Sequence, residues 1–105
     1  MARFDIYENP GRNKANIPYL VEVQSKVISG LATRIVIPLR HLAGFSRLTL
    51  PPDLFPLIVI DGKDYFLDTP QLGAIPSNEL KVRIGSAQDY RFEIQAALDR
   101  VFGSY

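Results

Sequence analysis

The sequence predicts an α+β fold, with about six or seven short strands followed by one C-terminal helix. Up to Ser86, apolar residues alternate with other residues in several short segments, and Gly, Pro and Asn separate these segments. After Ser86 the apolar residues recur every three or four positions, which is the period of an amphipathic helix.

Residues 3–8 form the first predicted strand, because Phe4 and Ile6 alternate with Arg3, Asp5 and Tyr7. The run Asn9-Pro10-Gly11-Arg12-Asn13 ends this strand as a turn, and a polar loop continues from there towards the next strand.

Residues 19–23 and 34–37 are the second and third predicted strands, since each shows an alternating apolar pattern typical of a partly buried sheet. Residues 24–33 between them are predicted to form a long loop, which carries two apolar residues, Val27 and Ile28. Residues 40–50 are ambiguous between a helical turn at 41–44 and a short strand at 47–50.

Pro51 and Pro52 stop whatever element precedes them. Residues 54–60 are almost continuously apolar, which predicts a strand covered on both faces, and Pro56 places its start at an edge or a strand entrance. Asp61-Gly62 then predicts a two-residue hairpin turn, because both residue types tolerate a positive φ.

Residues 65–67 return as the partner strand, and residues 69–76 form a broken segment. Leu80, Val82 and Ile84 alternate with Lys81 and Arg83 and predict a final strand, which Gly85-Ser86 closes.

The C-terminal helix is predicted from an apolar stripe at helical spacing. Ser86 is expected to cap its first turn, and Gly103 is a natural C-terminal stop. The stripe consists of Tyr90, Ile94, Ala97, Leu98 and Val101.

Composition favours one globular domain over residues 1–105. The chain is 47% hydrophobic and 22% charged, which excludes a disordered protein. Its twelve Lys and Arg residues are scattered, so the sequence shows no basic stripe of the kind that binds nucleic acid directly. It contains no Cys, which excludes a disulfide framework and a thiolate nucleophile. Without a signal-peptide pattern or an apolar run long enough to span a bilayer, we expect a cytoplasmic protein that does not bind membranes.

No residue set predicts catalysis, a cofactor or a metal. His41 is the only His, and although its neighbour Arg40 makes a ribonuclease-like pair conceivable, such a surface pair usually has no catalytic role. Asp61, Asp64 and Asp68 do not have the spacing of a calcium loop. We therefore expect a protein that is not an enzyme.

The sequences of two predicted strands resemble those of the CcdB family of bacterial toxins, which poison DNA gyrase. In that family a V-x-V-Q-S strand end is followed by a hydrophobic loop and a V-I-P-L strand. Here these pieces are Val21-Glu22-Val23-Gln24-Ser25 and Val36-Ile37-Pro38-Leu39. The step Asp53-Leu54-Phe55-Pro56 and the spacing from Pro76 to the C-terminus also fit the family, with the weakest similarity over 8–17 and 40–52.

The resemblance implies a small, strongly curved SH3-like β-barrel (CcdB/MazF-like) with a C-terminal helix, assembled as a symmetric homodimer. It also implies a toxin that binds the gyrase A subunit and traps gyrase on cleaved DNA. Carried over by position, the gyrase contacts fall in the loop and at the helix end, on Ser25, Val27, Ile28, Asp99, Phe102, Gly103, Ser104 and Tyr105.

The C-terminal residues depart from the family. Well-known members finish with Trp-Gly-Ile, and the Trp stacks on an Arg of gyrase, whereas this chain has Gly103-Ser104-Tyr105. Loss of an aromatic anchor from a small interface costs roughly 2 kcal/mol or more.

The resemblance further implies a cognate antitoxin, whose disordered C-terminal segment folds as it wraps the toxin dimer and whose complex represses the operon. The expected docking surface combines residues 8–17 with residues 40–46. The predicted contacts are Glu8, Asn9, Pro10, Gly11, Arg12, Asn13, Arg40 and His41.

Two alternatives stay open. The first is an mRNA endoribonuclease of the MazF/Kid type, for which Arg34, Arg40 and His41 are the only candidate catalytic residues. The second is a degenerate family member that binds antitoxin but poisons gyrase weakly or not at all, with Gly103 as the physical cause.

Overall fold

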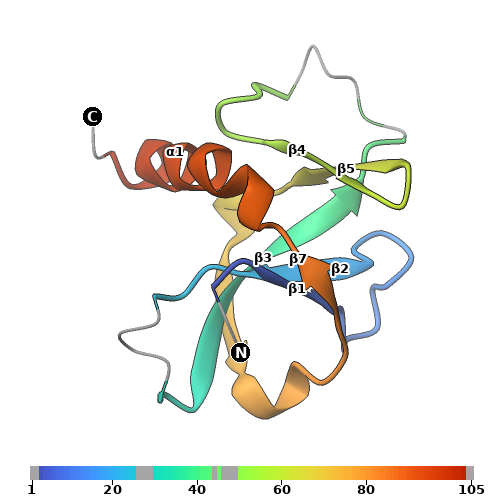
Figure 1. Ribbon diagram of the computed structural model, residues 1–105, viewed down its shortest axis with the longest axis vertical. Helices are drawn as coiled ribbons and strands as arrows, with labels where there is room; N and C mark the ends of the chain where they lie inside the picture. The colour runs from blue at the N-terminus through green and yellow to red at the C-terminus, as the bar shows by residue number, and fades with distance from the viewer. Residues whose placement is uncertain (1–2, 26–29, 44, 46–49, 104–105) are drawn as a thin grey trace.

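The computed structural model describes residues 3–25, 30–43, 45 and 50–103. Within these residues, seven antiparallel strands form one curled sheet in the order β4-β5-β3-β2-β1-β7, and β6 pairs with β3 off this path. The one α-helix among the described residues, α1, lies against one side of the sheet (Figure 1). The elements are β1 (Asp5–Glu8), β2 (Tyr19–Glu22), β3 (Thr33–His41), β4 (Leu57–Ile60), β5 (Lys63–Leu67), β6 (Gly73–Pro76), β7 (Arg83–Ser86) and α1 (Arg91–Phe102).

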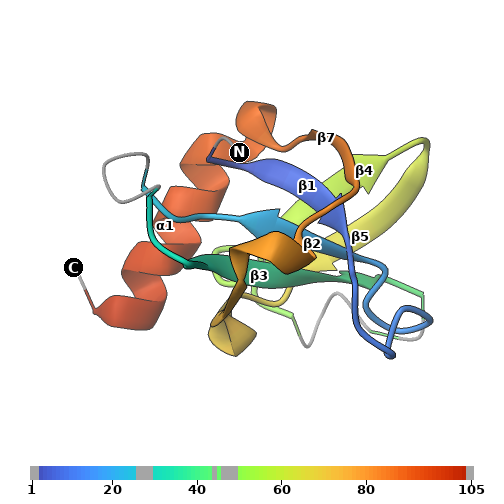
Figure 2. The ribbon, with the colours of Figure 1, turned by 90° about the horizontal axis from the view of Figure 1, so that it is seen from below.

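The longest strand, β3, explains the curl. Its first residues, from Thr33 to Val36, pair with β6, and its last residues, from Leu39 to His41, pair with β5. Because β3 changes partner along its length while β2 pairs with its middle, the sheet bends into a half-barrel, seen edge-on in Figure 2. The α+β prediction and the curled-barrel architecture are thereby confirmed.

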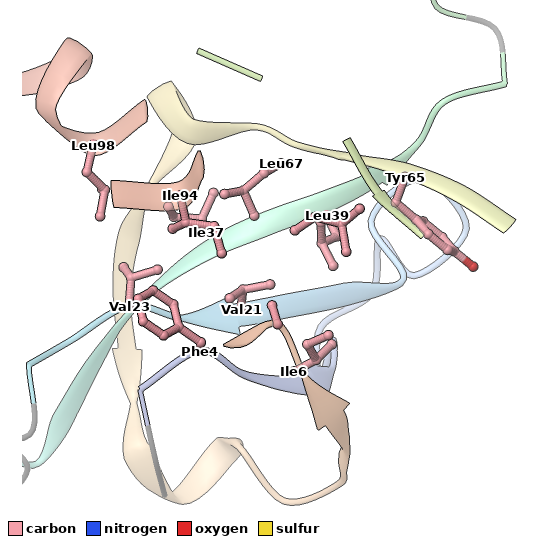
Figure 3. Packing of buried hydrophobic residues seen from close by; sticks show 12 residues of the cluster. Phe4, Ile6, Val21, Val23, Ile37, Leu39, Tyr65, Leu67, Ile94 and Leu98 are labelled. Carbon is pink, nitrogen blue, oxygen red and sulfur yellow. The ribbon is translucent and has the colours of Figure 1, made fainter. Parts of the chain in front are cut away.

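The sheet has two faces, and helix α1 covers one of them, the first face. Ile94 and Ala97 are fully buried and Leu98 is nearly so, as the predicted stripe requires. Figure 3 shows the side chains of Ile94 and Leu98 meeting apolar residues from β1, β2, β3 and β5. The buried cluster contains Phe4, Ile6, Val21, Val23, Ile37, Leu39, Ile58, Tyr65, Leu67, Ala87, Ile94 and Leu98.

Of the two helix ends, only the C-terminal one follows the sequence signal: the expectation that Ser86 caps the first turn is wrong, because α1 begins after Tyr90 and no side chain caps it. The Ser86 Oγ accepts a hydrogen bond of 3.1 Å from the Gln88 N–H, and a 3₁₀ turn at Gln88–Tyr90 leads into α1. Gly103 adopts a left-handed conformation with φ +70°, and its N–H donates to the Asp99 carbonyl. The predicted stop at Gly103 is therefore confirmed.

The second face of the sheet holds a smaller apolar cluster of Tyr7, Leu20, Val36 and Leu80. Asp5 is buried on β1 as well. The alternation along residues 3–8 therefore does not separate buried from exposed residues: Phe4 and Ile6 are buried on the first face and Tyr7 on the second, because the curled sheet covers both of its faces here.

The hairpin after β4 forms as predicted, with φ +51° at Asp61 and +77° at Gly62. The expectation that residues 54–60 are covered on both faces is wrong, because β4 is an edge strand and Val59 is 45% exposed. The Val59 N–H donates to the Tyr90 hydroxyl over 3.2 Å, so a side chain from before α1 satisfies one donor of this edge.

The last predicted strand is shorter than expected. A 3₁₀ turn occupies Ser77–Glu79 and β7 begins only at Arg83. Leu80 is buried, but Val82 and Ile84 are 49% and 39% exposed, since β7 is the other edge of the sheet. In the ambiguous segment His41 is the last residue of β3, while residues 44 and 46–49 lie outside the described residues.

Candidate partner-binding surfaces

The C-terminal end of α1 presents an aromatic ring to solvent. Phe102 is 67% exposed, although it is the last residue of a helix whose preceding turn is packed on the sheet. Asp99, one turn earlier, is partly buried and accepts a hydrogen bond of 3.1 Å from the Gln95 amide. A ring held on a packed helix loses little entropy on binding, which suits it as an interface anchor.

Gly103 has a structural role of its own. Its φ of +70° is a conformation that residues with a Cβ adopt only with strain, although a Cβ there meets no atom within 4 Å. The Gly at this position is explained by termination of the helix. Phe102 is the last residue of α1 and stands directly before this turn.

The predicted loop contact Ser25 is exposed and follows β2. It borders a hollow of about 540 Å³ that is lined by Arg3, Phe4, Asp5, Ser25, Arg83, Ser86 and Gln88. This hollow lies beside the residues that precede α1, so it does not include the predicted contacts Asp99, Phe102 and Gly103. The end of β2 and the C-terminal end of α1 nevertheless face the same side of the molecule in both views (Figures 1 and 2).

Four predicted gyrase contacts, Val27, Ile28, Ser104 and Tyr105, lie outside the described residues.

The loop after β1 is organised by Asn9. Its side-chain amide donates to the Ile17 carbonyl at 2.8 Å, and its Oδ1 accepts from the Gly11 N–H at 2.9 Å. Asn9 itself is buried, so its side chain holds the loop together. The neighbours predicted with it are exposed: Glu8, Pro10, Gly11, Arg12 and Asn13.

The structure brings the two predicted antitoxin segments together. A hollow of about 350 Å³ is lined by Ala15, Asn16, Arg40, His41, Ala43 and Phe45. Phe45 is 48% exposed and packs edge-to-face on Phe66, with 4.9 Å between ring centroids. An exposed aromatic beside a hollow of this size is suited to receive apolar side chains of a peptide.

The ribonuclease candidates do not converge. The Arg40 Nε lies 2.7 Å from the Asp68 carboxylate, and the His41 ring stacks on Tyr65 with 5.0 Å between centroids. Arg34 lies near the other end of β3 and is buried. Within the described part of the chain, no three His, Cys, Asp or Glu side chains are grouped to hold a metal, and no helix is long and apolar enough to cross a membrane.

Sequence reasoning missed a charged group in the interior. Glu22 and Arg34 are 3% and 8% exposed, and the Arg34 Nε lies 3.5 Å from the Glu22 Oε2. Burial raises the pKa of the Glu22 carboxyl, and Arg34 opposes that shift only in part. The available signal was a Glu between two valines of a predicted strand, a position that puts a charge on one face of the sheet.

Comparison with known proteins gives one family. The family model described as CcdB protein matches residues 3–103, which is nearly the whole chain and includes the β2–β3 connection and α1 up to Gly103. None of the curated proteins that were searched matches the chain. Since the family model matches far more than half of the sequence and the fold agrees with it, the chain belongs to the CcdB family.

Proposed function

We propose that this protein is the toxin of a type II toxin–antitoxin pair, binds the gyrase A subunit and traps gyrase on cleaved DNA. The observation that carries the proposal is the family match over residues 3–103, because CcdB proteins are gyrase poisons that act without catalysis of their own. The scattered ribonuclease candidates agree with a binding function. In this proposal residues 1–105 are one toxin domain that works as a homodimer in the bacterial cytoplasm.

Phe102 is the aromatic anchor of the gyrase contact. It is 67% exposed on a packed helix, and Gly103 turns the chain immediately after it. The ring therefore replaces the family's Trp from one position earlier in the sequence. Ser25, Val27 and Ile28 supply the loop contacts, and Asp99, Gly103, Ser104 and Tyr105 complete the helix-end contact.

The antitoxin docks on the opposite part of the surface, around the hollow between residues 8–17 and 40–45. Its support is the hollow that joins Ala15 and Asn16 to Arg40, His41 and Phe45. The exposed residues Glu8, Pro10, Gly11, Arg12 and Asn13 border this region, while Asn9 acts by holding the loop in shape. Through its antitoxin, the complex represses its own operon.

The test is a cleavage assay with purified gyrase, supercoiled DNA and ATP, together with a binding measurement on the gyrase A arm domain. We expect trapped double-strand breaks with the wild-type chain. Phe102→Ala should lower affinity on the order of thirtyfold, since an aromatic hot spot contributes roughly 2 kcal/mol.

Phe92→Ala is a matched control, because Phe92 is an equally exposed Phe of the same helix, at 70%. It should leave gyrase binding unchanged, and both variants should unfold at the wild-type denaturant concentration. Absence of both breaks and binding would refute the proposal, and total RNA would then be tested for cleavage. Binding without breaks would identify a degenerate family member.

A further inference from the structure

A buried ion pair spans the two ends of the β2–β3 connection. Glu22 is the last residue of β2, and Arg34 is the second residue of β3. The backbone register places Glu22 opposite Val36, so both charged side chains lie on the second face of the sheet, where the connection begins and ends.

The Arg34 side chain reaches from this pair back to the connection. Its Nη1 donates to the carbonyls of Leu31 and of Thr33, the latter at 3.0 Å. Its Nε lies 3.5 Å from the Glu22 Oε2. One guanidinium thus ties the end of β2 to the backbone of the residues that enter β3.

Further hydrogen bonds hold the residues that follow β2 against β3 and against the N-terminal segment. The Val23 N–H donates to the Ile35 carbonyl at 2.9 Å, and the Ile35 N–H donates to the Gln24 side chain at 3.2 Å. Arg3 donates from its Nε to the Val23 carbonyl at 3.1 Å. Ser25 follows Gln24 directly in the sequence.

Stability alone does not account for the pair. A buried ion pair costs much of its attraction in desolvation, and apolar residues of similar volume often replace it at no loss. Glu22 Oε1 accepts no hydrogen bond from the described residues, so the pair is also incompletely satisfied. The usual burial of apolar rather than charged residues is also reversed here, since Arg34 is buried while the adjacent Ile35 is 36% exposed. Such departures from local rules are expected where function requires them.

We propose that Arg34, held by Glu22, is a positioning residue for the part of the β2–β3 connection next to β3, residues 30–32. By fixing the carbonyls of Leu31 and Thr33 it sets the course of the chain on the β3 side of the connection, and the 53%-exposed Leu31 side chain becomes part of the contact surface. This inference rests on the proposed function, in which the connection binds gyrase through Ser25, Val27 and Ile28.

The test separates positioning from stability. In the double variant Glu22→Leu/Arg34→Met both charges are replaced by apolar side chains of similar length. We expect unfolding at the wild-type denaturant concentration or above, faster amide exchange at Val23 and Ile35, and unchanged exchange at Val21 and Ile37. Affinity for the gyrase A arm domain should fall tenfold or more.

Arg34→Lys tests the geometry of the contact, because Lys keeps the charge beside Glu22 but lacks the planar fork of Arg. Its affinity should stay below that of the wild type. Asp53→Asn is the control, since it removes an exposed ion pair with Arg100 at 3.1 Å and should leave gyrase affinity unchanged.

Each outcome decides the inference. Unchanged exchange at Val23 and Ile35 in the double variant would show that the pair does not hold the connection. Faster exchange with undiminished gyrase affinity would show that the connection is not positioned for gyrase. If the wild type itself does not bind gyrase, the proposed function fails, while the exchange measurement still decides whether Arg34 fixes the connection.

Discussion

The two faces of the sheet bury different chemistry. The face under α1 is lined by apolar side chains such as Ile37, Leu67 and Ile94, all fully buried. The second face is apolar around Leu20, Val36 and Leu80 but carries Asp5, Glu22 and Arg34 at its other end. The first face is built for stability. The charged end of the second face lies where the β2–β3 connection leaves the sheet. The desolvation cost of these buried charges is therefore linked to the proposed function.

The largest effect is expected on the helix-covered face. Ile94→Ala removes a fully buried side chain that packs between α1 and the sheet. It should destabilise the protein by about 3–4 kcal/mol, because the transfer and cavity terms add. Urea unfolding followed by circular dichroism measures this. If the loss of unfolding free energy were smaller than that caused by truncating a partly exposed apolar residue to Ala, α1 would contribute little to the core.

The apolar end of the second face should respond less strongly. Leu80→Ala truncates a residue that is 5% exposed and belongs to a cluster of four buried residues, so the site has fewer neighbours to lose. We expect a loss of about 2–3 kcal/mol in the same unfolding measurement. If Leu80→Ala cost more than Ile94→Ala, the helix-covered face would not be the main core.

A smaller effect is expected at the rim of the charged end. Arg83 is half-exposed and its Nε lies 3.0 Å from the Asp5 carboxylate, which is nearly buried. Arg83→Gln should cost about 1 kcal/mol or less, because solvent screens the exposed partner. The loss should shrink further in 0.5 M salt, a concentration at which screening is on the scale of a few ångströms. A loss independent of salt would contradict an electrostatic origin.

The subtlest difference is the pH dependence contributed by Glu22. Its folded-state pKa is raised above 4.5 by burial, so the fold favours the protonated carboxyl. The stability that this preference contributes is fully present below the unfolded pKa and is lost as the pH rises through the folded pKa. Glu22→Gln lacks this titration.

The unfolding free energy of the wild type minus that of Glu22→Gln should therefore fall as the pH rises from 4 and level off above the folded pKa. Urea titrations between pH 4 and pH 8 measure the difference. If the difference rose with pH instead, attraction to Arg34 would outweigh the desolvation of the carboxyl.

Local patterns in the sequence were sufficient for the elements that depend on local chemistry. The Asp61-Gly62 turn, the helical stripe around Ile94 and the stop at Gly103 were predicted because turn conformations and helical spacing are set by neighbouring residues. The family could also be inferred from the sequences of β2 and β3. The resemblance then gave Ser25 and Phe102 as candidate contacts.

Only the tertiary structure decided which faces are covered. Residues 54–60 were predicted to be a strand covered on both faces, yet β4 lies at the edge with Val59 exposed. The burial of the charged residues Asp5, Glu22 and Arg34 was not predicted at all. The reason is physical. Alternation fixes which residues share a face, but burial depends on the sheet order and the curl, and these arise from pairings between strands distant in the sequence.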